Sequence, residues 1–190
     1  MFSEILVNLN WIDILMGCIF VRCVFIGATN GLVIELFKLL GMLFASFTTL
    51  HYYVRFARFL HQTLAVHAVV NILLSYVLLW LFVVLIFKIF RDGWMIVLKT
   101  EAHASINKWG GFFFGLIRGV LVCGLTFQLL FVSDNKYLMK NAKTSMSGFY
   151  LMDLSPGIYG GFFDNFISKI FPQEGKNEEV FKLKFKKDSD

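Results

Sequence analysis

The sequence predicts an all-α membrane protein with four transmembrane helices. Hydrophobic residues make up 57% of the 190 residues and charged residues only 16%, whereas charge falls on about a quarter of the residues of soluble domains. The charge is also unevenly distributed, because residues 1–132 hold 14 charged side chains and residues 133–190 hold 17. We therefore expect a four-helix transmembrane domain over residues 1–132 and an interfacial or aqueous tail over residues 133–190.

Two spans stand out by length and apolar composition. Leu64–Phe87 has 24 residues without a formal charge, and at about 1.5 Å per residue such a helix exceeds a hydrocarbon core of roughly 30 Å. Trp109–Val132 is the second span, and its apolar run is interrupted only by Arg118.

The apolar stretch near the N-terminus is too long for one helix. Ala28-Thr29-Asn30-Gly31 is a turn signal in its middle. We divide the stretch into Trp11–Gly27 and Gly31–Leu50, which would form a tight helical hairpin. One long first span with a short re-entrant partner is the alternative.

The remaining segments predict helices that lie at the membrane surface. His51–Thr63 would connect the second and third spans. Lys88–Lys108 would connect the third and fourth, and it is apolar enough to lie on the membrane as a short amphipathic helix. Apolar residues recur in pairs every four positions over residues 158–171, between Ser155-Pro156 and Pro172, which predicts an amphipathic interfacial helix. Residues 173–190 are charged and predict a solvated tail.

The fourth span carries glycines at four-residue spacing, at Gly111, Gly115 and Gly119, continued by Cys123. Glycines four residues apart share one helix face, where a neighbouring backbone can approach closely. The stripe serves packing within the monomer or an interface between subunits. We expect Gly115 to make the closest contact, and Gly124, which is off this face, to tolerate leucine.

Four ionisable residues lie inside the predicted spans: Arg22, Glu35, Lys38 and Arg118. Counted along the helices from the Gly31 side, all four lie about 6–12 Å deep and converge in one layer. A charge at the bilayer centre costs at least about 2.5–3.5 kcal/mol, so these groups should face each other or water. We favour a structural pair of Glu35 with Arg118 or Arg22. The alternative is a site for an anion or a lipid headgroup in a polar crevice.

No catalytic or ligand-binding motif is present. The sequence lacks H-E-x-x-H, G-x-S-x-G, a Walker loop and G-x-G-x-x-G, and its four histidines are scattered. Three cysteines in apolar runs, at 18, 23 and 123, predict buried free thiols. Basic residues beside aromatic ones fit a headgroup belt better than a nucleic-acid groove. We expect no catalytic residue, cofactor, metal ion or nucleic-acid partner.

Several residues occur in an order that is typical of one family. The first span opens with Trp11-Ile12-Asp13, and the fourth reads Gly111-x3-Gly115-x2-Arg118-Gly119 after a charge-free third span. Over roughly residues 10–171 the chain resembles the colicin V production protein (CvpA) family of small bacterial inner-membrane proteins with four predicted spans. The positions that carry the resemblance are Asp13, Gly31, Glu35, Gly41, Gly115, Arg118 and Gly119.

The chain departs from this family's pattern at two places. A basic residue commonly precedes the glycine of the first turn, where this chain has Asn30, and Asp-Arg often precedes the fourth span, where it has Asn107-Lys108. The resemblance implies a role in toxin (colicin V) production or envelope homeostasis, and it implies no known reaction.

The hydropathy pattern predicts a multi-pass membrane protein, and the resemblance implies one of the bacterial inner membrane that acts as a non-enzymatic envelope or secretion accessory factor. Its expected partners are the lipid bilayer and either further copies of itself or other envelope proteins. A small oligomeric channel or transporter, with the charged layer lining a path, is the alternative. A membrane enzyme that uses Asp13 or Glu35 is a third hypothesis.

Overall fold

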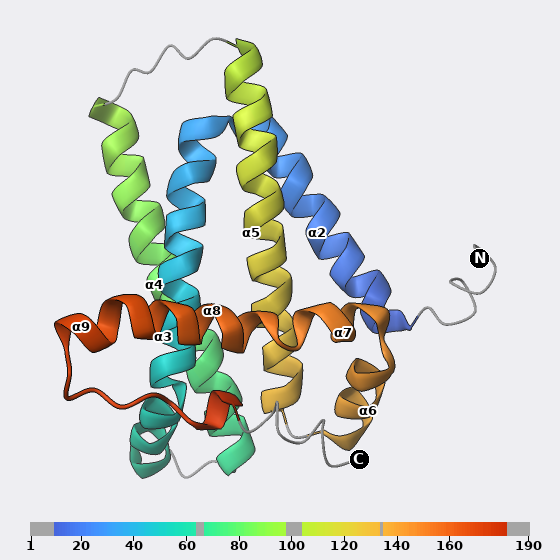
Figure 1. Ribbon diagram of the computed structural model, residues 1–190, viewed down its shortest axis with the longest axis vertical. Helices are drawn as coiled ribbons and strands as arrows, with labels where there is room; N and C mark the ends of the chain where they lie inside the picture. The colour runs from blue at the N-terminus through green and yellow to red at the C-terminus, as the bar shows by residue number, and fades with distance from the viewer. Residues whose placement is uncertain (1–9, 64–66, 98–103, 134, 182–190) are drawn as a thin grey trace.

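Four long helices dominate the fold. The structure is a computed structural model that describes residues 10–63, 67–97, 104–133 and 135–181. The helices α2 (Trp11–Asn30), α3 (Leu32–Thr63), α4 (Ala68–Val97) and α5 (Ala104–Val132) run alternately up and down (Figure 1). Each is long and apolar enough to cross a membrane. Short helices follow: α6 (Lys136–Thr144), α7 (Met146–Leu151), α8 (Leu154–Phe162), the π-helical turn η1 (Phe163–Ile167) and α9 (Ser168–Ile170).

This architecture confirms the predicted all-α membrane fold, and it changes three boundaries. The segment His51–Thr63, predicted as a connection, continues α3 to a length of 32 residues. Residues 88–97 likewise prolong α4, and residues 104–108 begin α5. The described parts of the third connection therefore extend the spans rather than form a separate surface helix, and residues 98–103 lie outside the described residues. Helices of this length project beyond a hydrocarbon core of roughly 30 Å.

The spatial order of the helices differs from their order in the chain. α3 packs against α4 on one side and α5 on the other, while α2 packs against α5. Gly31 turns the chain between α2 and α3, as expected, with φ +86°, a conformation that favours glycine. The two helices then diverge from this turn (Figure 1). They therefore do not form the packed hairpin that the sequence predicted.

Glycines bring the backbones of α2 and α5 together. A Cβ atom on Gly115 would lie 3.0 Å from the Cα of Gly27, and one on Gly111 would overlap the carbonyl oxygen of Gly27. Gly119 faces Phe20, whose ring would lie 3.0 Å from such an atom. The stripe thus packs within the monomer. Its tightest point is Gly111 rather than Gly115, because the turn at Gly31 also presses on Gly111.

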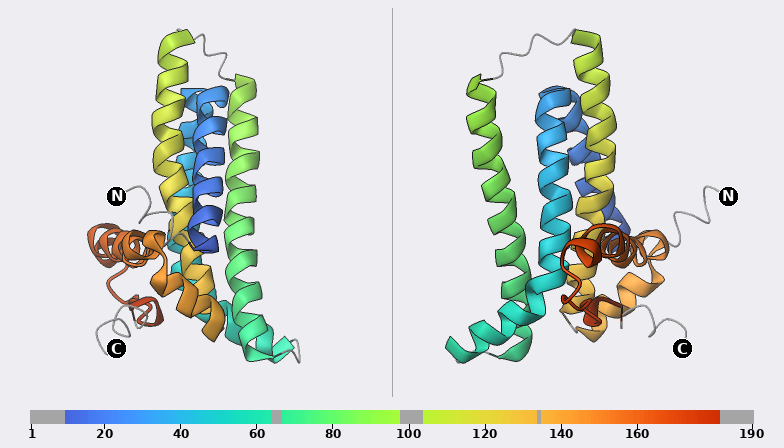
Figure 2. Two further views of the ribbon diagram at one scale, coloured as in Figure 1. Left: turned by 90° about the vertical axis from the view of Figure 1, so that its right-hand side faces the viewer. Right: turned by 60° about the vertical axis from the view of Figure 1, so that its left-hand side comes forward.

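The C-terminal helices form a bar across the bundle. α7, α8, η1 and α9 lie end to end and cross α5 and α3 (Figures 1 and 2). Pro156 fits in the first turn of α8, where a missing N–H costs nothing. The predicted helix over residues 158–171 is therefore present up to Ile170. Its apolar face was expected to lie in lipid, yet Phe47 on α3 stacks on Tyr159 and packs against Phe162, with ring centroids 5.7 and 5.1 Å away.

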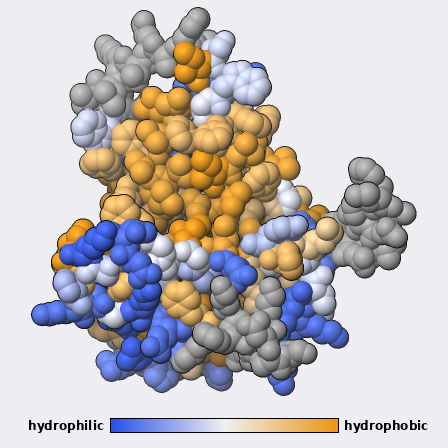
Figure 3. Space-filling model, in the orientation of Figure 1, coloured by the Kyte–Doolittle hydropathy of each residue, from blue (hydrophilic) through white to orange (hydrophobic). Residues whose placement is uncertain are grey.

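The bar marks a boundary on the surface of the molecule. Apolar residues cover the surface on the Gly31 side of it, and hydrophilic residues gather around and below it (Figure 3). The outer face of α4 exposes Phe82, Leu85 and Ile89, as expected for a surface in contact with lipid. Phe166 and Ile170, at the end of the bar, are more than half exposed. That this part of the helix lies in the membrane interface stays a prediction.

Residues 173–181, which we call the C-terminal strap, return beneath the bar. Asn177 donates a side-chain hydrogen bond of 2.7 Å to the carbonyl oxygen of Leu50, and Val180 is fully buried. Lys176 pairs with Asp164 of η1 at 2.7 Å. The prediction of a solvated tail is therefore wrong for Asn177 and Val180, which attach the strap to the fold, whereas most of the other residues of the strap are exposed as expected. Residues 182–190 lie outside the described part of the chain.

The glycine contact makes the first testable prediction. Gly111→Leu and Gly115→Leu should each greatly reduce the yield of folded monomer, because the opposing atoms belong to backbone that cannot move aside locally. Overpacking of a core costs about 1–3 kcal/mol where side chains can adjust, and more is expected here. The measurement is the amount of monodisperse protein recovered after extraction in mild detergent.

Gly17→Leu is the matched control, because nothing lies within 4 Å of a Cβ atom on this exposed α2 glycine. Gly124, the control that the sequence suggested, is unsuitable: its Cβ atom would lie 2.9 Å from Ser155 Oγ. Equal yields for leucine at 17 and 115 would contradict the assignment of the stripe to the α2–α5 contact.

Candidate functional site

The centre of the candidate site is a carboxylate buried among the spans. Glu35 lies in the first turn of α3 and is fully buried. A carboxylate near a helix N-terminus is stabilised by the helix dipole. Residues Asn30, Lys38 and Arg118 surround its two oxygens, and together they form the Glu35 cluster. This position explains how the membrane interior tolerates the charge, since every neighbour carries a donor.

Arg118 joins three helices at this point. Its Nε lies 2.9 Å from Glu35 Oε2 on α3, and its terminal nitrogen donates a 3.1 Å hydrogen bond to the carbonyl oxygen of Cys23 on α2. The Nε–H does not point directly at Oε2, so this contact is an ion pair rather than an aligned hydrogen bond. Of the two partners weighed for Glu35, the structure therefore selects Arg118.

The second oxygen of Glu35 is occupied by two further donors. Lys38 Nζ donates to Oε1 at 2.7 Å and Asn30 Nδ2 at 3.1 Å. Asn30 stands where the family pattern commonly has a basic residue, and here its neutral amide makes the contact. Two cations face one carboxylate, so the cluster carries one excess positive charge.

Arg22 does not belong to this layer, contrary to the expectation. Its side chain is exposed on the outer face of α2, among Ile14, Val21 and Phe25. Counting residues from the turn estimates how far a residue lies along the helix, but it does not say which way the side chain points around the helix axis. The α2 face that carries Cys23 and Gly27, not Arg22, turns toward α5.

Asp13 has a structural role at the opposite end of α2. Its Oδ1 accepts hydrogen bonds from the backbone N–H and the hydroxyl of Ser147, at 2.7 and 2.6 Å. Its Oδ2 accepts from the backbone N–H of Met146 and, in a capping box, from that of Asn10. Asp13 thus satisfies the first N–H groups of α7 as well as the N–H of Asn10, the residue that caps α2. Both oxygens of Asp13 therefore accept hydrogen bonds from the chain itself.

The other residues that carry the family resemblance also join helices. Gly41 on α3 receives Phe87 of α4, whose Cβ would lie 2.8 Å from an added methyl group. Gly31 faces the side chain of Asn107, and Asn107 Oδ1 accepts a 2.7 Å hydrogen bond from the N–H of Leu32. Asn107 therefore caps α3 from α5. In the sequence Asn107 stands out only as a departure from the family pattern, because a cap from 75 residues away leaves no local signal.

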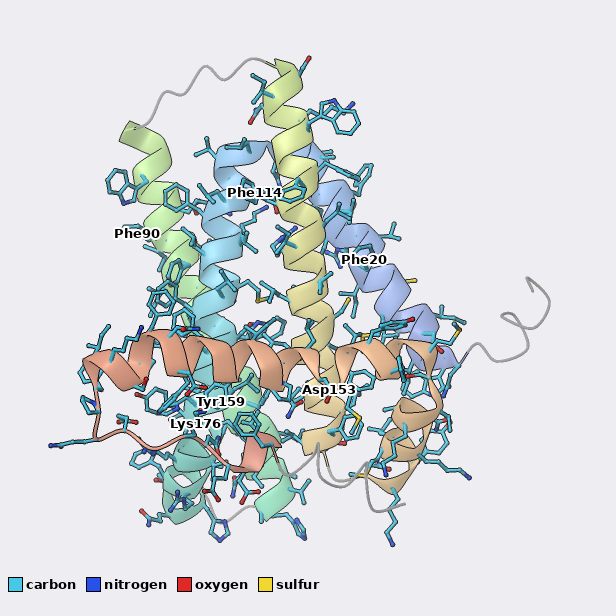
Figure 4. The ribbon with its side chains drawn as sticks, viewed as in Figure 1. Phe20, Phe90, Phe114, Asp153, Tyr159 and Lys176 are labelled. Atoms are coloured by element: carbon cyan, nitrogen blue, oxygen red, sulfur yellow. The ribbon has the colours of Figure 1, made fainter. Side chains whose placement is uncertain are left out.

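A second polar cluster, which the sequence did not predict, lies beneath the bar. His51 of α3 is buried; its Nδ1 lies 2.8 Å from the hydroxyl of Tyr159, and its Nε2 lies 2.8 Å from Glu174. The hydroxyl also accepts from the N–H of Asn177 at 2.8 Å. In the tautomer that satisfies every partner, Nε2–H donates to the Glu174 carboxylate and the Tyr159 hydroxyl donates to Nδ1. Tyr159 lies on the lower side of α8 in Figure 4. This chain of bonds fastens the C-terminal strap to α3.

Two ionisable groups of this cluster, Glu174 and Tyr159, have shifted pKa values. The pKa of Glu174 is lowered from its ordinary value of 4.5, first because His51 donates a hydrogen bond to it and then because Arg55 lies beside it, while desolvation opposes the shift. Burial raises the pKa of Tyr159. Glu174 is therefore ionised and Tyr159 neutral near pH 7.

Within the described residues, no group of three histidine, cysteine or acidic side chains is arranged to hold a metal ion. Cys23 and Cys123 are buried free thiols, as the sequence predicted, whereas Cys18 is exposed.

Comparison with known proteins identifies one family. The family model described as colicin V production protein matches residues 12–156. No curated protein and no solved structure matches the chain. The matched region includes all four long helices almost entirely, together with the Asp13 and Glu35 contacts.

The Glu35 cluster makes the second prediction. Glu35→Gln should lower the free energy of unfolding by about 3–5 kcal/mol, because removal of one partner leaves Arg118 buried without its counter-charge. The loss is measured as reduced thermal stability of the protein in detergent. Asp92→Asn is the control, since this carboxylate is 54% exposed and pairs with the adjacent Arg91.

Reversal of the pair, with Glu35→Arg and Arg118→Glu together, should recover part of the lost stability. Thermal stability unchanged by Glu35→Gln would show that the pair does not hold α3 to α5.

The strap makes the third prediction, which concerns pH. Folding lowers the pKa of Glu174. The contribution of this carboxylate to the stability of the strap is therefore complete above pH 4.5 and is lost as the pH falls through the lowered pKa. We expect the N–H of Asn177 to be protected from hydrogen exchange at pH 7 and to lose protection below pH 4.5, after correction for intrinsic rates. Glu174→Gln should abolish this transition.

Asp164→Asn is the matched control, because it removes the exposed Lys176 pair in the same strap, and such pairs contribute little. If the transition disappeared in Asp164→Asn and survived in Glu174→Gln, it would report the titration of Asp164 and not of Glu174, and the prediction would be contradicted.

Proposed function

The chain belongs to the colicin V production protein family, and we propose that it is a non-enzymatic accessory protein of the bacterial inner membrane. In this proposal it supports toxin (colicin V) production or secretion, or the homeostasis of the envelope. It is a multi-pass membrane protein, with four helices able to span the bilayer.

The observation that carries this proposal is that the buried charged residues and the residues of the family pattern hold helices of the chain together. Glu35, Arg118, Asp13 and Gly31 each join one helix to another through contacts within the chain. A general acid or base must reach the proton that it transfers. Both oxygens of Asp13 accept hydrogen bonds from the chain itself, and the Glu35 carboxylate is held by hydrogen bonds to Oε1 and by the ion pair of Oε2 with Arg118. This arrangement supports a scaffold rather than an enzyme that uses either residue.

The surfaces of the molecule indicate which partners such a scaffold would have. Apolar side chains on the outer faces of α2 and α4 suit contact with lipid. On the bar, Phe149 and Tyr150 are 68% and 73% exposed beside the hydrophilic surface, a composition that suits the membrane interface or another envelope protein. We therefore propose the bilayer and envelope proteins, or further copies of the chain, as partners, and no nucleic acid.

The alternative is a small oligomeric channel or transporter. The observation that favours it is a group of cations, including Lys38 and Arg118, around a crevice between α3 and α4. Against it, both Lys38 and Arg118 are paired with Glu35 inside one chain, and a pore requires its charged groups to face water.

A pair of measurements tests the proposal, which is the fourth prediction. Liposomes containing the purified protein should show no chloride or potassium flux above that of empty liposomes. In cells that make colicin V but lack their own copy of this protein, the wild-type chain should restore the secreted toxin or the integrity of the envelope. Gly17→Leu should do so too, whereas Gly115→Leu should not.

Flux that depends on Lys38 or Arg118 would favour the channel. Full restoration by Gly115→Leu without folded protein in the membrane would contradict a scaffold role.

A further inference from the structure

We propose that the crevice between α3 and α4 binds one phosphate-type anion, such as the headgroup phosphate of an anionic lipid, through Lys38, Lys88, Arg91 and Arg118. These four cations line a cavity of about 220 Å³ on the side of α3 that faces α4. They come from three helices, because Arg118 reaches in from α5. A convergence of this kind is a feature of basic pockets between transmembrane helices that hold lipid headgroups.

The charge balance of the crevice is the first argument. Lys38 and Arg118 share one carboxylate, that of Glu35, and Arg91 pairs with Asp92 at 2.6 Å. Among the described residues, Lys88 makes no ion pair, so four cations face two carboxylates. Two positive charges remain beside low-dielectric surroundings, where an uncompensated charge is unfavourable. An anion bound in the crevice would neutralise them.

The side chains also have the form that phosphate recognition requires. The side chains of Lys38, Arg91 and Arg118 are only 14–21% exposed, so they are already held in place by their surroundings. Guanidinium groups bind phosphate oxygens through paired hydrogen bonds, and lysines add point charges. Lys88 lies on the exposed surface of α4, where a ligand can approach from the bilayer.

The rest of the crevice is apolar and suits the hydrocarbon part of a lipid. Phe37 and Phe87 are among its lining residues. Phe90, one turn away on α4, packs edge-on against Phe37 of α3 with centroids 6.4 Å apart, and Figure 4 shows Phe90 on the upper part of α4. Lys38 lies about 9 Å along α3 from Leu32, and Lys88 about 14 Å along α4 from Val97. The phosphate would therefore lie near the headgroup region, with its acyl chains along the exposed outer face of α4.

The experiment uses the full chain, first stripped of lipid in detergent and then titrated with short-chain phosphatidylglycerol or phosphatidylcholine. Bound lipid is counted by native mass spectrometry. We expect phosphatidylglycerol to bind more tightly than phosphatidylcholine. Lys88→Gln should weaken the binding of phosphatidylglycerol about tenfold, equal to about 1.4 kcal/mol at 25 °C. Lys88→Arg should retain the wild-type affinity.

Arg22→Gln is the matched control, because it removes one exposed cation from a span outside the crevice. An equal loss in Arg22→Gln and Lys88→Gln would overturn the proposal in favour of general attraction to a basic protein. No loss in Lys88→Gln would overturn it as well. If Lys88→Gln does not fold, as judged by its helical circular dichroism, Arg91→Gln provides the same comparison.

A third titration, with inorganic phosphate alone, separates the two sources of the ligand. Phosphate that displaces phosphatidylglycerol in a Lys88-dependent manner would identify a soluble phosphate compound as a ligand of the same site. Binding of phosphatidylglycerol that phosphate does not displace would identify the lipid. Failure of both ligands to bind would refute the anion site.

Discussion

The close approach of α2 and α5 positions the other polar contacts on the Gly31 side of the bundle. With glycine at 27, 111 and 115, the two backbones come near enough for Arg118 to reach the carbonyl oxygen of Cys23 while its other nitrogen faces α3. The same contact places Asn107 over the N-terminus of α3. A side chain at these glycines would move α5 outward and separate the donors from their acceptors. The contacts that Arg118 makes with Cys23 and Glu35 therefore depend on the close packing of the glycines.

Charge in this protein is handled differently at the two ends of the bundle. On the Gly31 side, Glu35 is fully buried and its donors come from helices that cross the membrane. Beneath the bar, Glu174 is partly exposed and bonds to His51 at the aqueous end of α3. Loss of a donor in the first case leaves a charge in low dielectric. In the second case water replaces the donor, which makes the strap the more easily released of the two attachments.

Much of this fold follows from the sequence, and what does not follow has physical reasons. Length and apolar composition identified four spans, and the Asn30-Gly31 pair located the first turn, because both signals are local. The stripe at Gly111, Gly115 and Gly119 correctly predicted a close helix contact. The orientation of Arg22 was missed, because hydropathy reports depth and not direction around the axis. The bonds of His51 to Tyr159 and Glu174 join residues 108 and 123 positions apart, so no spacing rule could pair them.

The order of the four spans in space has a consequence for how the protein is assembled. Spans enter the membrane in the order in which they are synthesised, yet α2, the first described span, finds its packing partner in α5, the last. Until α5 arrives, Gly27 and Cys23 face lipid or another protein, and Glu35 has no arginine opposite it. The early spans would then form an assembly intermediate with an unsatisfied carboxylate and a bare glycine face. Completion of the described fold thus requires α5, since both the glycine contact of α2 and the arginine opposite Glu35 are supplied by it.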